Sequence, residues 1–267
     1  MSETVHRVGV VLSGGGVRAA AHVGLLKALS ERDLEPTALA GASAGALVAA
    51  MYATRRSFNQ TLDVFRDNEL FSWNYFGMVR KPGLLDAEKI MEGFEHVLGD
   101  KTFSDTTREL HIVATNLLDG TAHYFRDGPL APAVMASSAY PGVISPIEFD
   151  GMLLSDGGIV DNLPIEPLLG RCDVLIGSFV NPVETLTMDE LRTTLAVSQR
   201  AFHISTTNIL RAKLAQCDFA IAPVSLLDIG IFELKRTNEA FEIGYETAQS
   251  ILDGVEQRLE RARALRS

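Results

Sequence analysis

The first 54 residues twice alternate a short apolar run, a turn of small residues and a helical segment. Residues 8–13 (VGVVLS) end at three glycines, and residues 18–32 then carry apolar side chains at helical spacing. Residues 38–42 form a second short apolar run, and residues 44–54 are rich in alanine. Strands that alternate with helices are typical of a parallel sheet with helices on its faces. This alternation predicts an α/β fold.

The rest of the chain continues the mixed pattern without a repeat, a linker or a shift in composition. We therefore expect one domain over residues 1–267. Strands are expected at 110–115, 173–180 and 219–222, a hairpin arm at 118–125 and a hairpin at 149–154. Helices are expected over most of 57–99, over 186–213 and from 237 to the end.

Charge and cysteine content exclude several classes of protein. Lys plus Arg total 24 against 34 for Asp plus Glu, a net charge of −10, so a broad basic face for nucleic acid is not expected. Two cysteines, Cys172 and Cys217, exclude a disulfide scaffold and are expected as buried free thiols. No targeting segment is visible at the N-terminus, and we expect a cytoplasmic protein that contacts membranes peripherally at most.

Residues 41–45 read Gly-Ala-Ser-Ala-Gly, a G-x-S-x-G sequence between an expected strand and an expected helix. A serine in such a turn is exposed, and the helix N-terminus beyond it favours developing negative charge. Gly41 and Gly45 are small enough for the turn to close. The alternative is a helix N-cap serine, Ser43, in a glycine-rich turn.

Gly14, Gly15 and Gly16 lie in a second strand-to-helix turn. They could open a dinucleotide-binding fingerprint with Ala19 at its sixth position. They could instead form an oxyanion hole, because consecutive glycines can turn several backbone N–H groups towards one point. A tight turn without a ligand is the third alternative.

Asp156 begins the sequence Asp-Gly-Gly and follows an expected hairpin turn at Asp150-Gly151. Gly157 and Gly158 predict a flexible, uncrowded backbone around its carboxylate. Taken alone, Asp156 could be a turn residue and nothing more.

Together, and in this order, the three motifs resemble the patatin-like phospholipase family, and its short bacterial members most closely. The family has a glycine-rich oxyanion loop, a G-x-S-x-G turn and a later D-G-G or D-G-A. Residues 136–142 (ASSAYPG), 161–164 (DNLP) and 228–230 (DIG) are also similar, so the resemblance covers almost the whole chain. It implies a three-layer α/β/α fold with a mainly parallel central sheet. Ala19 departs from the family's usual glycine, and its methyl group is expected to tighten the loop–helix junction.

The resemblance implies a serine–aspartate dyad that cleaves acyl esters of lipids. Ser43 would attack the ester carbonyl, and Asp156 would accept the hydroxyl proton and later activate water. Gly14, Gly15 and Gly16 would form the oxyanion hole, with Gly15 and Gly16 as its main donors. Arg18, Gly41, Gly45, Gly157 and Gly158 are supporting residues, and Arg18 would anchor the glycine loop or attract a phosphate head group. No metal or other cofactor is expected.

A histidine base is the alternative to the dyad. Of the six histidines only His203 follows Asp156, and it lies in an expected helix rather than in a loop after a strand. His22 lies near the glycine loop and is expected to be a packing residue.

The substrate side is less constrained. We expect a lipid or other acyl ester as partner, transient contact with a membrane surface and no nucleic acid. The aromatic residues within 71–76 form either an apolar lid or a core-facing stretch, and residues 134–147 and 226–232 could line an acyl groove. Alternatives are a small-ester or thioester hydrolase, a non-catalytic regulatory protein with the same fold, and a dinucleotide-dependent oxidoreductase. The last leaves Ser43 and Asp156 unexplained.

Overall fold

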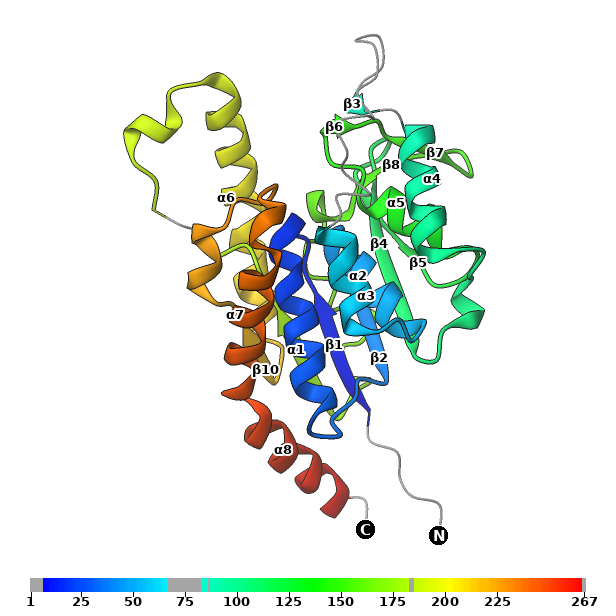
Figure 1. Ribbon diagram of the computed structural model, residues 1–267, viewed down its shortest axis with the longest axis vertical. Coiled ribbons are helices and arrows are strands. Elements are labelled where there is room, and N and C mark those ends of the chain that lie inside the picture. Colours follow the sequence, from blue (N-terminus) through cyan, green and yellow to red (C-terminus); the bar gives the residue numbers. More distant parts are fainter. Residues whose placement is uncertain (1–6, 67–82, 86, 183–184, 266–267) are drawn as a thin grey trace.

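An eight-stranded sheet forms the middle layer of the protein, in the order β10-β9-β1-β2-β4-β8-β7 with β5 also paired to β4 (Figure 1). The computed structural model describes residues 7–66, 83–85, 87–182 and 185–265. The strands are β1 (Val8–Leu12), β2 (Ala38–Ala42), β4 (Glu109–Asn116), β5 (Thr121–Phe125), β7 (Ile147–Phe149), β8 (Met152–Asp156), β9 (Val174–Ser178) and β10 (Phe219–Ile221). From β10 to β4 the strands are parallel, and β5, β7 and β8 are antiparallel to their neighbours.

Helices cover both faces of this sheet, which confirms the three-layer α/β/α architecture. The main helices are α1 (Ala20–Ser30), α2 (Ala44–Ala53), α3 (Phe58–Arg66), α4 (Ala87–Leu98), α5 (Leu130–Ser137), α6 (Thr194–Leu214), α7 (Thr237–Gln249) and α8 (Leu252–Ala264). The buried apolar residues divide into two clusters. Val10 and Leu12 of β1 belong to the cluster that includes α1 and α2, whereas Val11 packs with Leu163 and with Leu210 of α6. Alternate residues of β1 thus serve opposite faces, which requires an apolar strand throughout.

The structure departs from the expectations in three respects. The helix expected from residue 237 to the end is interrupted near Ser250, because the turn redirects α8 onto β10, where Gly254 faces the Phe219 ring. A short strand, β3 (Gly83–Leu85), pairs with β6 (Gly142–Ile144). Cys172 and Cys217 are free but only partly buried, and burial raises the pKa of Cys217 to about 11.

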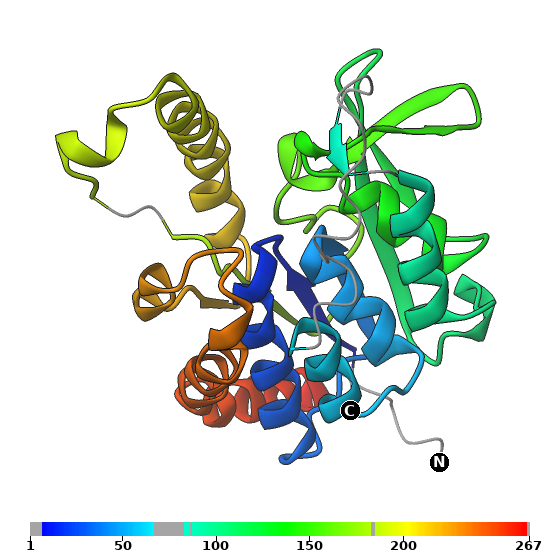
Figure 2. The same ribbon diagram turned by 45° about the horizontal axis from the view of Figure 1, so that its top comes forward.

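The register of the sheet brings the ends of β1, β2 and β8 to one place. Leu12 pairs with Gly41, so the turns that follow β1 and β2 emerge side by side. Across β4, Ala42 pairs with Val113 and Asp156 pairs with Ala114. The residue after Ala42 is therefore level with Asp156 on the other side of one strand. Figure 2 shows this end of the sheet between α6 on one side and the β6–β8 segments on the other.

Candidate active site

Ser43 and Asp156 are in direct contact at this end of the sheet. The Ser43 hydroxyl donates to Asp156 Oδ2 at 2.6 Å, a distance typical of a charge-assisted hydrogen bond between a hydroxyl and a carboxylate. Ser43 has φ 53° and ψ −128°, a backbone conformation that few residues other than glycine adopt. A serine held in this conformation in a strand-to-helix turn has the geometry of a nucleophile elbow.

The glycines on either side of Ser43 are required by close backbone contacts. A Cβ at Gly41 would lie 2.7 Å from Ala46 Cα, and one at Gly45 would lie 2.4 Å from the carbonyl oxygen of Leu12. Any larger residue would therefore push α2 away from β1 and β2. The spacing G-x-S-x-G reflects this packing of the turn against the ends of two strands.

The Asp156 carboxyl group is buried, with 4% of the residue exposed. Its Oδ1 accepts the N–H of Gly158 at 2.7 Å. Burial raises the pKa of Asp156 to about 6, against the opposing effect of the hydrogen bonds from Ser43 and Gly158. No positively charged side chain of the described residues contacts this carboxylate. A carboxylate in these surroundings is a stronger base than an exposed aspartate.

The prediction of an uncrowded backbone after Asp156 is wrong. A Cβ at Gly157 would lie 2.2 Å from the carbonyl oxygen of Val113, and one at Gly158 would lie 2.9 Å from both Asn162 Oδ1 and Asp156 Oδ1. The two glycines are needed because the acid loop, residues 157–163, lies directly against β4 and against its own Asn162. This crowding fixes the aspartate.

The glycine loop, residues 14–16, lies beside Ser43, and a Cβ at Gly14 would be 2.8 Å from Ser43 Cβ. The Gly14 N–H donates to Asn162 Oδ1 at 2.8 Å, so the expectation that Gly14 is an oxyanion donor is wrong. Gly16 has φ 57° and lies against Ile231, whose carbonyl accepts the N–H of Val17 at 2.9 Å. Within the described part of the chain, nothing accepts the N–H groups of Gly15 and Gly16.

Comparison with known proteins agrees with this geometry. The sequence model of the family described as Patatin-like phospholipase matches residues 10–169, which include Ser43, Asp156 and both glycine-rich turns. An uncharacterized NTE family protein of Mycobacterium tuberculosis is 37% identical over 185 residues, which are 67% of this chain and 50% of that protein. The chain belongs to the patatin-like phospholipase family.

Two other relatives of this patatin-like protein are informative. Lysophospholipase nte1 of Aspergillus fumigatus is 26% identical over 92% of this chain and 18% of that protein. The crystal structure of VipD from Legionella pneumophila covers 93% of this chain and 67% of that chain, with a TM-score of 0.59 and 15% identity, and shares the fold. The chain spans about half the length of the mycobacterial relatives it matches.

Arg18 of this patatin-like protein is linked to the glycine loop through Asn181. It is 7% exposed and donates to the carbonyl of Ile229 at 2.5 Å and to Asn181 Oδ1 at 3.1 Å. Asn181 in turn donates to the carbonyl of Gly14 at 3.2 Å. The guanidinium is committed to the protein itself, which favours the anchoring interpretation over capture of a phosphate head group.

Of the two histidines considered above, the structure describes the side chain of His22 but not that of His203. His22 is fully buried, with one ring nitrogen 2.9 Å from Ser178 Oγ and the other 2.8 Å from the carbonyl of Ser13. Burial lowers the pKa of His22 to about 4, so this ring is neutral and supports the residue that precedes the glycine loop. His203 lies in α6, and its side chain is outside the described ones. The contact between Ser43 and Asp156 is direct, and His22 takes no part in it.

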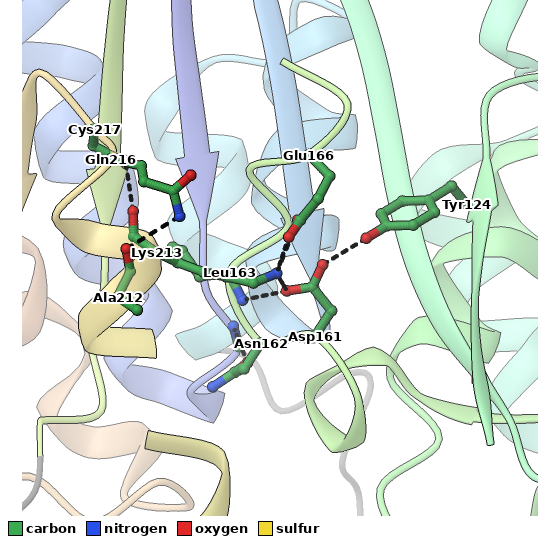
Figure 3. Close-up of polar contacts among 10 residues, drawn as sticks. Tyr124, Asp161, Asn162, Leu163, Glu166, Ala212, Lys213, Gln216 and Cys217 are labelled. Carbon is green, nitrogen blue, oxygen red and sulfur yellow. Dashed lines mark hydrogen bonds and ion pairs between the residues drawn. The ribbon is translucent and has the colours of Figure 1, made fainter. Parts of the chain in front are cut away.

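A second buried aspartate holds the acid loop in place (Figure 3). Asp161 Oδ1 lies 2.6 Å from the Lys213 ammonium of α6, and the Tyr124 hydroxyl of β5 donates to Asp161 Oδ2 at 2.6 Å. Lys213 also contacts Glu166 at 2.7 Å. A cavity of about 120 Å³ lies beside this cluster and is lined by residues 158–162, Ser205, Leu210 and Lys213. Sequence reasoning missed Tyr124 and Lys213, since neither lies in a motif.

The remaining expectations concern the surroundings of the site. The aromatic residues of 71–76 lie outside the described residues. Of the segments proposed for an acyl groove, Val134 and Leu226 are fully buried in the core, whereas Phe232 is 58% exposed. Among the described residues, no helix is long and apolar enough to cross a bilayer, and no three His, Cys, Asp or Glu side chains are arranged to bind a metal ion.

Proposed function

We propose that this protein is a lipid acyl hydrolase with Ser43 as nucleophile and Asp156 as base. The observation that carries this proposal is the 2.6 Å hydrogen bond between the Ser43 hydroxyl and the buried Asp156 carboxylate. The strained backbone of Ser43 and the adjacent glycine loop support it, because a turn of this kind exposes the serine Oγ and the loop offers N–H donors to an oxyanion.

The reaction follows from these contacts. Ser43 Oγ forms a bond to the ester carbonyl carbon while its proton passes to Asp156 Oδ2. The carbonyl oxygen becomes an oxyanion that accepts the N–H groups of Gly15 and Gly16. The ester C–O bond then breaks, and the proton on Asp156 moves to the leaving alcohol oxygen. A water molecule then attacks the acyl carbon while one of its protons passes to Asp156. The bond between the acyl carbon and Ser43 Oγ breaks, the proton moves from Asp156 to Oγ, and the fatty acid leaves.

The pKa of Asp156 suits this role. A base is most effective when its pKa is near the working pH while it remains largely ionised. With a pKa of about 6, Asp156 is ionised at neutral pH and more basic than an exposed aspartate. Burial of a single carboxylate thus replaces the histidine of a three-residue site.

Lysophospholipids with a long acyl chain are the substrate class that we propose, acted on during transient contact with a lipid surface. Membership of the patatin-like phospholipase family and a relative named lysophospholipase support this choice.

We further propose that residues 1–267 act as one patatin-like domain. In support, β9 lies between β1 and β10 although the family match ends at residue 169, and α7 packs on α1 with Gly244 against Ala21.

A fluorophosphonate probe tests the proposal, because it forms a covalent bond only with an activated serine. We expect the wild type to be labelled at Ser43, with no label in Ser43→Ala and much slower labelling in Asp156→Asn. Hydrolysis of palmitoyl-lysophosphatidylcholine should follow the same order and exceed that of 4-nitrophenyl acetate. Folded wild-type protein that neither reacts with the probe nor hydrolyses either ester would refute the assignment.

A further inference from the structure

The last residue of α5, Ser137, contacts the backbone of the nucleophile. Its hydroxyl oxygen lies 2.8 Å from the backbone nitrogen of Ser43 and accepts that N–H. Ser137 is fully buried, so the contact is shielded from solvent. The two residues are 94 positions apart in the sequence, and neither the G-x-S-x-G motif nor the proposed dyad accounts for this hydrogen bond.

The same end of α5 also holds the acid. The carbonyl of Ala139 accepts the N–H of Asp156 at 3.0 Å and the hydroxyl of Ser155 at 2.7 Å. Ser137 and Ala139 thus connect one short segment to the backbone of both Ser43 and Asp156. A shift of this segment would change the distance between the two reacting side chains.

The backbone of Ser43 needs such support because its conformation is strained. A residue other than glycine at φ 53° costs about 1–3 kcal/mol and persists only where the surrounding structure enforces it. The carbonyl of Ser43 is held by the first turn of α2, where it accepts the N–H groups of Ala46 and Leu47. The N–H of Ser43 is held by Ser137. These contacts fix the peptide groups on both sides of the nucleophile.

We infer that Ser137 is a positioning residue for ester hydrolysis. Its hydroxyl holds the Ser43 N–H, and thereby directs Ser43 Oγ towards Asp156 Oδ2 and the glycine loop. This inference rests on the proposed function of Ser43 and Asp156. Without the hydroxyl, the peptide between Ala42 and Ser43 is free to rotate towards a relaxed conformation, and Oγ moves away from its line of attack.

The test compares Ser137→Ala with a control, Thr61→Val. Thr61 of α3 is also buried, and its hydroxyl donates to the carbonyl of Ser57 at 3.1 Å, so the control removes a buried hydroxyl outside the turns that carry Ser43 and Asp156. With palmitoyl-lysophosphatidylcholine, Ser137→Ala should lower kcat by about 10- to 100-fold, because misplacement by an ångström has effects of this size. KM should change by less than about two-fold, because the lost contact holds the nucleophile rather than the substrate. Thr61→Val should match the wild type in both constants.

Conservative variants separate positioning from a general loss of structure. Ser137→Thr restores the hydroxyl acceptor and should recover much of the lost kcat, whereas Ser137→Cys keeps the size but offers only a weak acceptor and should remain slow. The rate of fluorophosphonate labelling at Ser43 should follow the same order, and thermal unfolding identifies any variant that fails to fold. If Ser137→Ala does not fold, the kcat of Ser137→Thr relative to that of Ser137→Cys tests the role of the hydroxyl.

The outcomes distinguish this inference from the function on which it rests. A folded Ser137→Ala or Ser137→Cys with wild-type kcat, beside an inactive Ser43→Ala, would overturn the role of Ser137 and leave the hydrolase assignment standing. A Thr variant as slow as the Ala variant at equal thermal stability would also overturn it. A wild type without labelling or turnover would refute both.

Discussion

Asp156 and Asp161 are two buried aspartates of the same loop region, five positions apart, and each is 4% exposed. The carboxylate of Asp156 meets a serine hydroxyl and a backbone N–H, both neutral. The carboxylate of Asp161 meets the Lys213 ammonium and the Tyr124 hydroxyl. The two carboxylates are equally buried but differ in their electrostatic surroundings, because only Asp161 has a positively charged partner among the described residues.

Burial alone does not make an aspartate reactive. An opposite charge compensates the desolvation of Asp161, so this residue ties α6 and β5 to the acid loop. Nothing of the kind compensates Asp156 among the described residues, and its pKa rises to about 6. Burial and the charge of Asp161 raise the pKa of Tyr124, which keeps that phenol protonated as a donor. In the proposed function, Asp156 takes a proton, whereas Asp161 holds the acid loop.

The largest expected difference between the two aspartates is in hydrolysis. Asp156→Asn should lower kcat/KM for palmitoyl-lysophosphatidylcholine by about 10³- to 10⁴-fold, the upper range for loss of a general base. Asp161→Asn should stay within about tenfold of the wild type, since it affects the acid only through the loop. Assays at pH 8 on folded proteins, checked by circular dichroism, measure both. Equal losses in the two variants would contradict the division of roles.

The two substitutions should change stability in opposite directions. The pKa of Asp156 is higher in the folded state than its usual 3.8, so stability is lost as pH rises through about 6. At pH 7 the buried, ionised carboxylate of Asp156 lowers the free energy of unfolding by about 3 kcal/mol. Asp156→Asn should therefore raise the free energy of unfolding by about 1–3 kcal/mol. Asp161→Asn leaves the ammonium of Lys213, 13% exposed, with Glu166 alone and should lower it by about 3 kcal/mol.

Urea unfolding at pH 7 measures the free energies of unfolding of the two variants and the wild type. The same measurement at pH 4.5 tests whether the ionised form of Asp156 causes the difference. At the lower pH Asp156 is mostly protonated in the folded protein, so the gain from Asp156→Asn should shrink. A destabilised Asp156→Asn at pH 7 would show that this carboxylate, like Asp161, contributes to stability.

The rate of hydrolysis should depend on pH through Asp156. Because the base must be ionised, kcat/KM should fall about tenfold for each pH unit below about 6 and be level above it. Asp161→Asn should keep the same midpoint, because the group that titrates is unchanged. Initial rates between pH 4.5 and 8.5 test this, and a midpoint that moves by a full unit in Asp161→Asn would assign the titration to both aspartates.

The smallest expected effect concerns Glu166, the outer partner of Lys213. Its side chain is 51% exposed, and ion pairs at such positions contribute less than about 1 kcal/mol. Glu166→Gln should therefore leave turnover unchanged and lower the free energy of unfolding by no more than that amount. A loss as large as that of Asp161→Asn would show that Lys213 depends on Glu166 as much as on Asp161.

The sequence predicted the elements whose causes are local. The two strand–turn–helix units, with Gly41 and Gly45 at the elbow, follow from spacing and residue size within a few positions. The contacts that orient the site come from distant segments and left no local signal. Ser137 reaches Ser43 across 94 positions, and Asn162 occupies the N–H of Gly14 across 148. The direction of one N–H therefore could not be read from the glycine loop alone.

The place of β9 has a consequence for any attempt to shorten the chain. All five residues of β1 are buried, and β9 pairs with each of them. Cutting the protein after residue 169 would turn β1 from an interior strand into an exposed edge with a row of unpaired backbone groups. Apolar edges of this kind recruit strands from other molecules, so the shortened protein would be prone to aggregation. Residues 170–267 therefore also protect the edge of β1 from pairing with other molecules.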